Sequence, residues 1–124
     1  MGLLDRSGLL SKKGRRYRDV ELPSGGTARL QSLTELERSE YNSELLDKKG
    51  EVDRKKLTFG TAMLLVRMLV DEEGKRLFLD NEYEELSSID SLDMEVLGDE
   101  ARKHVGFDAE TRKELKKKSE ATQD

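Results

Sequence analysis

The segment LTFGTAMLLVRMLV, residues 57–70, constrains the fold more than any other part of the chain. It concentrates apolar residues in a chain that is 34% hydrophobic and 40% charged, against about 45–50% and about 25% in average soluble domains. Its spacing predicts a helix from near Asp53 to near Val70. One face carries Leu57, Thr61, Leu64, Leu65 and Met68, and another carries Phe59, Met63, Val66 and Val70. A helix that is apolar nearly all round is either a central core helix or is covered by a second chain.

We predict that one small protomer does not cover this whole helix, so that its second face binds another polypeptide. The candidate partner-binding residues are Phe59, Met63, Val66 and Val70, joined by Leu77 and Phe78 from the segment that follows. Gly60 in the helix interior costs about 1 kcal/mol relative to alanine. Its presence suggests that another backbone approaches closely there.

The length of 124 residues suits a single domain with a modest core. We predict a flexible basic arm over residues 1–16, one globular domain over residues 17–107, and a charged C-terminal helix or disordered tail over residues 108–124. The arm would dock through Leu3, Leu4, Leu9 and Leu10. Residues 1–18 carry six bases and one acid, whereas residues 71–100 carry twelve acids and two bases. Such blocks are usually solvated surfaces, but they also steer charged partners.

Residues 17–33 show alternating apolar positions on both sides of a Pro-Ser-Gly-Gly turn, which predicts a β-hairpin. Thr34 and Glu37 form the pattern of a capping box, so a helix should begin there and end near Gly50. A short helix should follow Asp80 or Asn81. A longer one should run from Asp90 or Ser91 to about residue 105, with Gly98 as a candidate break. The predicted fold class is α+β, mostly α-helical: an N-terminal β-hairpin packed on a small bundle of about four helices.

The acidic stretch LVDEEGKRLFLD, residues 69–80, is either a metal site or a turn. An EF-hand loop needs glycine at its sixth position and a bidentate glutamate at its twelfth. Here Gly74 is the fourth residue counted from Asp71, and Lys75 and Arg76 would neutralise the carboxylates. We therefore predict a turn that ends the apolar helix, with Gly74 as its C′ residue, and no metal.

Catalytic chemistry finds little support in the sequence. The chain has no cysteine, and its one histidine, His104, near a predicted helix end, is expected to be a surface residue. No strand–elbow–helix pattern places a nucleophile, and PSGGT lacks the phosphate-loop spacing. We predict no catalytic, metal-binding or cofactor-binding residues and no enzymatic activity.

The basic run KKGRRYR, residues 12–18, is of the kind that contacts nucleic-acid backbones. The net charge of −4 and the acidic block argue against that partner. A solubilising arm and a protein-docking arm remain as alternatives. No apolar run approaches the roughly 20 residues that span a bilayer, and no secretory signal is evident. These observations predict a cytoplasmic protein with no membrane partner.

Several elements in order resemble the tail assembly chaperones of long-tailed bacteriophages and their prophage relatives. The matching positions are Gly26, Arg29, Leu33, Thr34, Glu37 and Arg38, then Leu69 to Gly74 and Arg76 to Phe78. The resemblance covers roughly residues 17–105. It implies a non-catalytic protein that binds the tape measure protein, promotes assembly of the tail tube protein around it, and is absent from the mature virion.

Other assignments remain open beside this resemblance. The chain could instead be a head–tail connector, a minor tail component or a small nucleic-acid-binding regulator. Further burial in a homo-oligomer would suit a chain with so few apolar residues. The resemblance also implies a longer form made by frameshifting. The codons of KKKSE, residues 116–120, are the candidate site, and a plain charged helix end is the favoured alternative for this stretch.

Overall fold

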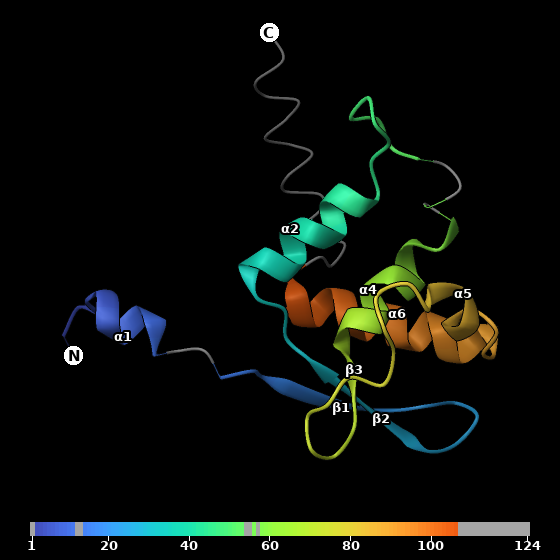
Figure 1. The fold of residues 1–124 in the computed structure, drawn as a ribbon. Coiled ribbons are helices and arrows are strands. Elements are labelled where there is room, and N and C mark those ends of the chain that lie inside the picture. The colour runs from blue at the N-terminus through green and yellow to red at the C-terminus, as the bar shows by residue number, and fades with distance from the viewer. Residues whose placement is uncertain (1, 12–13, 54–55, 57, 107–124) are drawn as a thin grey trace, which may run out of the picture.

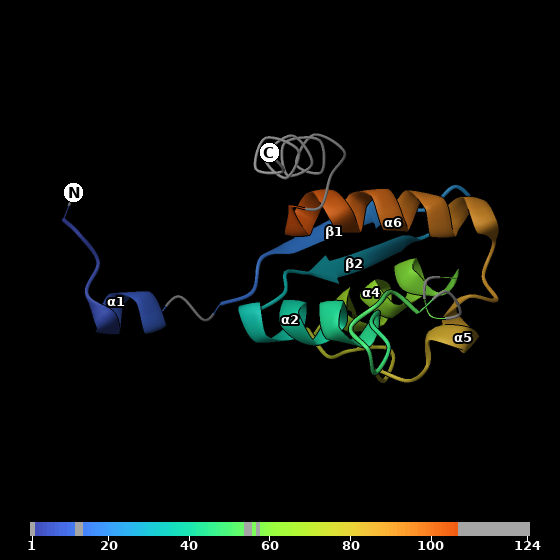
Figure 2. The same cartoon turned by 90° about the horizontal axis from the view of Figure 1, so that it is seen from above.

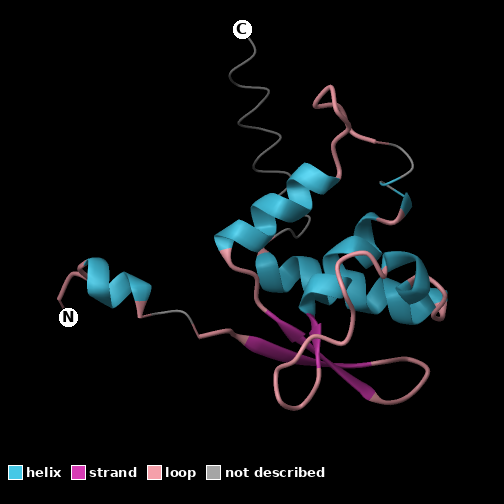
Figure 3. Ribbon diagram, in the orientation of Figure 1, coloured by secondary structure: helices cyan, strands magenta, loops and turns pink. Residues whose placement is uncertain are grey.

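The computed structural model describes residues 2–11, 14–53, 56 and 58–106, and it shows a sheet covered by helices (Figure 1). In chain order the elements are α1 (Arg6–Leu10), β1 (Tyr17–Glu21), β2 (Thr27–Gln31), α2 (Glu35–Glu44), α4 (Gly60–Met68), β3 (Leu69–Val70), α5 (Tyr83–Leu86) and α6 (Ser91–Val105). The sheet is antiparallel with the order β1-β2-β3. The helices α2, α4, α5 and α6 gather on one side of the strands (Figure 3). The predicted α+β class is confirmed.

Strands β1 and β2 form the predicted hairpin. Val20 pairs with Ala28 across the two strands. Val20 and Leu30 are buried, so their apolar face points toward the helices. In the turn, Gly25 and Gly26 have φ angles of 107° and 91°, a region that residues with a Cβ atom rarely adopt. The two glycines therefore permit the reversal that brings the strands together.

Leu69 and Val70 form a third strand, where the sequence predicted the last residues of a helix. α4 ends at Met68, and Leu69 has an extended backbone with ψ of 124°. Leu69 then lies opposite Leu30, and Val70 opposite Arg29, on the free edge of β2. This pairing gives hydrogen-bond partners to backbone N–H and C=O groups on that edge. The periodicity of side chains carries no information about this requirement. The predicted helix to Val70 is therefore wrong at its end; its expected start near Asp53 adjoins residues 54 and 55, outside the described residues.

The acidic loop after β3 is a tight hairpin turn. The Asp71 N–H donates to the Lys75 carbonyl oxygen over 2.8 Å, and Gly74 has φ of 82°. The Asp71 carboxylate accepts hydrogen bonds from the backbone N–H groups of Glu73 and Lys75. The bond from Lys75 is the main reason that the pKa of the Asp71 carboxyl is lowered. A turn is confirmed, but Gly74 is not a helix C′ residue, because α4 has already ended.

Helix α6 packs along α4 as one continuous helix. A Cβ atom built on Gly98 would lie 2.8 Å from the Thr61 Cγ2 atom. Gly98 therefore allows close contact between the helices, and its predicted role as a helix break is wrong. At Gly60 the nearest atoms to such a Cβ are 3.9 Å away. The close approach predicted at Gly60 is found at Gly98 instead.

Helix α2 begins at the predicted capping box. The Thr34 side chain accepts from the Glu37 N–H, and the Glu37 side chain accepts from the Thr34 N–H. None of the residues of α2 is buried. The helix ends at Glu44, before the predicted end near Gly50, and Leu46 then forms an isolated β-bridge to Val52. Strand-like pairing thus replaces the last helical turn that the sequence predicted.

Helix α1 lies apart from the domain in two perpendicular views (Figures 1 and 2). The Asp5 side chain accepts from the Gly8 N–H at its start. After α1 in the sequence, two arginines bind the chain to the domain. The Arg15 side chain donates to the Ser32 carbonyl oxygen over 2.8 Å, and the Arg16 side chain donates to the His104 carbonyl oxygen over 3.1 Å. These two residues therefore belong with the domain, although the sequence placed them in the arm.

His104 is 9% exposed, and its Nε2 atom lies 3.2 Å from the Arg16 carbonyl oxygen. The predicted surface position is wrong, because the chain before β1 covers the end of α6. The predicted tail, residues 108–124, lies outside the described residues. Among the described residues, no helix is both long and apolar enough to cross a bilayer.

Candidate partner-binding surface

The face of α4 that was predicted to bind a partner is covered by the same chain. Met63 and Val66 are 0% exposed and Val70 is 3% exposed. These three residues belong to the protein interior, so their assignment to a free surface is wrong in this structure. Val70 is drawn into the sheet by β3, and α2, α5 and α6 all contact α4. The periodicity of a helix shows that an apolar face must be buried, but it does not show whether the same chain or another chain buries it.

Arg67 allows the polar helix α2 to complete this cover. Its side chain is buried and donates to the Met63 carbonyl oxygen over 2.8 Å and to the Glu44 carboxylate of α2. The guanidinium lies 6.0 Å from the centre of the Tyr41 ring. The Tyr41 hydroxyl in turn donates to the Gly60 carbonyl oxygen over 3.1 Å. Arg67 thus links the mostly apolar helix α4 to polar side chains of α2.

Phe59 immediately precedes α4 and borders an open groove. Its ring centre lies 5.4 Å from that of Tyr83, with 49° between the ring planes, a tilted geometry that aromatic pairs favour. Both residues are partly buried, which leaves apolar ring surface facing the groove. We call this cavity of about 440 Å³ the Phe59 groove; Asp53, Lys56, Thr58, Phe59, Tyr83 and Glu84 line it.

Leu77 lines a second open groove, of about 570 Å³, together with Ala28 and Val70. We call it the Leu77 groove. Leu77 is 53% exposed. At the rim, Asp19 and Arg29 form an ion pair in which Arg29 Nε lies 2.7 Å from Asp19 Oδ1. This bond is the main cause that lowers the pKa of the Asp19 carboxyl. The groove therefore combines an apolar floor with a charged rim.

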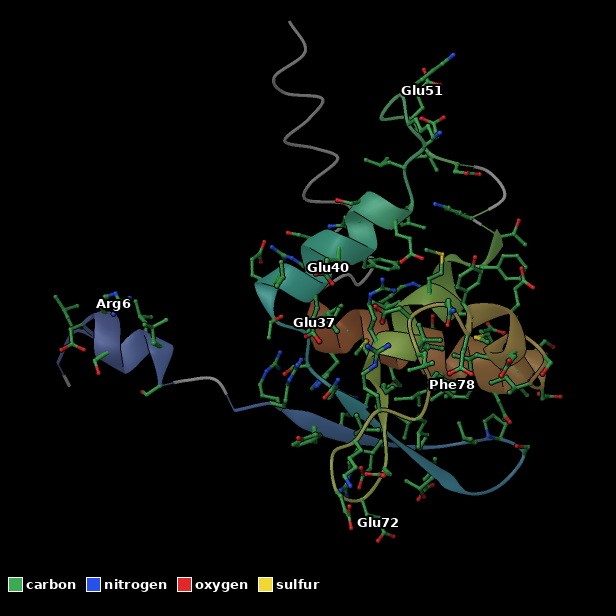
Figure 4. The ribbon with its side chains drawn as sticks, viewed as in Figure 1. Arg6, Glu37, Glu40, Glu51, Glu72 and Phe78 are labelled. Atoms are coloured by element: carbon green, nitrogen blue, oxygen red, sulfur yellow. The ribbon has the colours of Figure 1, made fainter. Side chains whose placement is uncertain are left out.

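Phe78, the last of the predicted contact residues, is partly buried and packs against the hydrophobic core. Figure 4 shows its side chain among the helices, whereas Glu72 lies out at the tip of the acidic turn. Phe78 therefore anchors the chain after that turn. Of the six predicted residues, the structure places Phe59 and Leu77 at open grooves, and Val70, although nearly buried, borders the Leu77 groove.

Tyr83 is the groove residue that the sequence prediction missed. It was expected to face inward with Leu86, and it does pack partly against the core. The structure shows that it also lines the Phe59 groove. An aromatic residue among the acids of NEYEEL, residues 81–86, is the signal that could have indicated a surface role. Tyrosine suits such a place because its ring is apolar and its hydroxyl is polar.

The part of the chain that the structure describes contains no cluster of three or more His, Asp or Glu side chains that could hold a metal ion. The grooves instead present apolar ring and aliphatic surface beside carboxylates. Such an arrangement can bind apolar side chains of another polypeptide and attract basic ones.

These features define a small α+β domain with open, partly apolar grooves bordered by charge. Comparison with protein-family models, curated proteins and solved structures finds no match for the chain.

Proposed function

We propose that this protein is a tail assembly chaperone of a long-tailed bacteriophage or prophage, and that it binds the tape measure protein without catalysing a reaction. The resemblance of residues 17–105 to that family supports the proposal. By the same resemblance, the tail tube protein is its second partner. The chaperone works in the bacterial cytoplasm and is absent from the mature virion.

The observation that carries the proposal is the Phe59 groove. It is an open groove of about 440 Å³ at the surface of the domain. The rings of Phe59 and Tyr83 offer an apolar floor. An amphipathic helix binds such a groove by inserting side chains spaced three or four residues apart. The family's client, a long and largely helical protein, supplies segments of this kind.

Charge around the groove favours basic client segments. The charged residues that line it are two acids, Asp53 and Glu84, and one base, Lys56. The protein as a whole carries a net charge of −4. Complementary charge accelerates encounter and selects partners more than it adds affinity. The remaining acidic surface would keep a chaperone–client complex soluble.

The test is co-expression with the tape measure protein, read out as the soluble fraction of the client and its capture by the chaperone. We expect the Phe59→Asp and Glu84→Lys variants to lose capture, because each places an unsuitable charge in the groove. The matched control is Leu36→Asp, which adds the same charge at a leucine of α2 that is 68% exposed and outside the groove lining.

Thermal melts of each variant separate loss of binding from loss of folding. Glu84 is exposed, so Glu84→Lys tests the groove without entering the core. Full capture by a folded Glu84→Lys and a folded Phe59→Asp variant would contradict the proposal. Mass spectrometry of purified virions gives a second check, because a connector or a tail component would be present there and a chaperone would not.

A further inference from the structure

Helix α2 turns an almost wholly polar face toward the domain. Of its ten residues, three are partly buried and seven are exposed. The three, Glu37, Tyr41 and Glu44, are spaced four and three residues apart, so they share one face of the helix. Leu36, the one leucine of α2, is 68% exposed. The helix therefore covers the domain with two carboxylates and one aromatic ring.

The C-terminal half of α2 is joined to α4 mainly through polar groups. The Glu44 carboxylate accepts from the buried Arg67 guanidinium, and the Tyr41 hydroxyl donates to the Gly60 carbonyl oxygen over 3.1 Å. Tyr41 also packs against the core, and the Leu45 side chain lies near Gly60. Burying an ion pair costs much of what its attraction returns, because both groups lose water. Separation of α2 from α4 returns that water to both groups, which lowers the free energy of opening.

The N-terminal half of α2 is anchored to a different part of the domain. The Arg15 side chain donates to the Glu37 carboxylate and to the Ser32 carbonyl oxygen, just after β2. The capping box of Thr34 and Glu37 fixes the first turn of the helix. These bonds do not involve α4, so the start of α2 can stay in place when its other end moves.

The strip of α4 beneath α2 consists of Gly60, Leu64 and Arg67. These residues are spaced four and three apart, so they share one face of α4, and Gly60 and Arg67 both bond to α2. All three are buried. The other sides of α4 contact the sheet, α5 and α6. Movement of α2 therefore exposes this strip and leaves those other contacts in place.

We propose that α2 is a lid: its C-terminal end moves away from α4 while the rest of the domain stays folded, and this exposes the strip of Gly60, Leu64 and Arg67. Proteins open locally in units, and units with few buried apolar contacts open at the lowest free energy. α2 has no buried residue, whereas eight of the nine residues of α4 are buried. This inference goes beyond the proposed function, because opening requires no client.

Thiol reactivity of the full chain measures the opening. The chain has no cysteine, so a single introduced one reports on one position. Gly60→Cys places a thiol beneath α2, where the nearest atoms to a Cβ, those of Leu45 and Tyr41, are 3.9 Å away. Leu65→Cys places one on another side of α4, at a position that is 0% exposed.

The two thiols should differ in how their reaction rates depend on urea. We expect the Gly60→Cys thiol to react in the folded protein at a rate that changes little with low urea, because opening the lid exposes little surface. The Leu65→Cys thiol should react only through global unfolding, with the full urea dependence of that transition.

Substitutions on α2 connect the reaction to the lid. Glu44→Ala removes the carboxylate that Arg67 binds and should speed the reaction of the Gly60→Cys thiol about thirtyfold. The matched control is Glu35→Ala, which breaks the exposed ion pair with Arg38 on the same helix. It should change the rate by less than about twofold.

Leu64→Cys repeats the measurement further along the strip, and circular dichroism shows whether each variant is folded. Equal urea dependence for Gly60→Cys and Leu65→Cys overturns the proposal, because α2 then leaves only when the domain unfolds. A Gly60→Cys rate that Glu44→Ala does not change also overturns it. So does a folded Leu64→Cys variant that reacts only through global unfolding, because the motion is then confined to the start of α4. Since no client is present, these failures leave the client-capture experiment unaffected.

Discussion

Helices α2 and α4 lie against each other, yet they are held in opposite ways. Of the nine residues of α4, all except Thr61 are buried, whereas none of the ten residues of α2 is buried. α4 is held by apolar contacts with the sheet, α5 and α6. α2 is joined to α4 by hydrogen bonds from Arg67 to Glu44 and from Tyr41 to the Gly60 carbonyl oxygen, and of its residues Tyr41 also packs against the core.

This difference shows how a chain poor in apolar residues encloses an apolar helix. The sheet, α5 and α6 cover most of α4, and the side that faces α2 carries the buried Arg67. Burial of apolar surface stabilises the fold by about 25 cal/mol per Å². The net contribution of a hydrogen bond to the free energy of unfolding is only about 1 kcal/mol. The stability of the domain should therefore depend steeply on α4 and weakly on α2.

The largest effect is expected from Met63→Asp and Leu65→Asp. Both side chains are 0% exposed, and an unpaired charge in such a place costs several kcal/mol. Both variants should therefore unfold, as measured by circular dichroism and urea titration. Leu36→Asp on α2 is the matched control and should change stability by less than about 0.5 kcal/mol. A Met63→Asp variant that folds would show that this face of α4 is exposed.

A smaller loss is expected from Glu44→Ala, which leaves the buried Arg67 guanidinium without its carboxylate. We expect about 2 kcal/mol of destabilisation, less than for a fully enclosed pair because Glu44 is partly exposed. Glu35→Ala removes the exposed ion pair with Arg38 on the same helix and should cost less than about 0.5 kcal/mol. Equal losses in the two variants, measured by urea unfolding, would mean that Arg67 does not depend on α2.

Two glycine substitutions compare how tightly α4 packs against α6 and against α2. Gly98→Ala brings a Cβ atom to 2.8 Å from Thr61 Cγ2 and should destabilise by about 1–3 kcal/mol through overpacking. Gly60→Ala, on the side of α2, meets its nearest atoms at 3.9 Å and should be neutral or stabilise by up to about 1 kcal/mol. Urea unfolding checks both, and the reverse order would show that α2 packs more tightly than α6.

The smallest effect concerns the ion pair of Arg15 with Glu37, at the start of α2. Burial raises the pKa of the Glu37 carboxyl, but bonds from Arg15 and Thr34 outweigh it and hold the pKa below its ordinary value of 4.5. The carboxylate therefore stabilises the fold above pH 4.5, and this stabilisation is lost as the pH falls through the lowered value.

Arg15→Gln should remove part of that dependence. The variant should be slightly less stable than the parent at neutral pH, and the difference should shrink as the pH falls through the lowered pKa of the Glu37 carboxyl. Thermal melts across this range provide the measurement. A difference that grows toward acid would show that the pair does not stabilise α2.

Local patterns predicted much of the fold. The Gly25–Gly26 turn, the capping box at Thr34 and the turn at Asp71 each depend on residues close in sequence, and all are found. Less of the candidate site could be predicted. Phe59 and Leu77 lie at open grooves and the nearly buried Val70 borders one of them, but Met63 and Val66 are enclosed, and Tyr83 was missed. Whether an apolar residue is covered depends on segments distant in sequence, which periodicity does not place.

By itself, the sequence determined that this chain forms an α+β domain around one strongly apolar segment, because side-chain spacing and backbone preferences act over a few residues. Tertiary structure alone decided that the chain covers that segment, that Leu69 and Val70 leave the helix for the sheet, and that Gly98 is the point of close contact. The hydrophobic effect favours burial of an apolar segment but does not specify which residues bury it. Only the packing of distant segments supplies the particular neighbour.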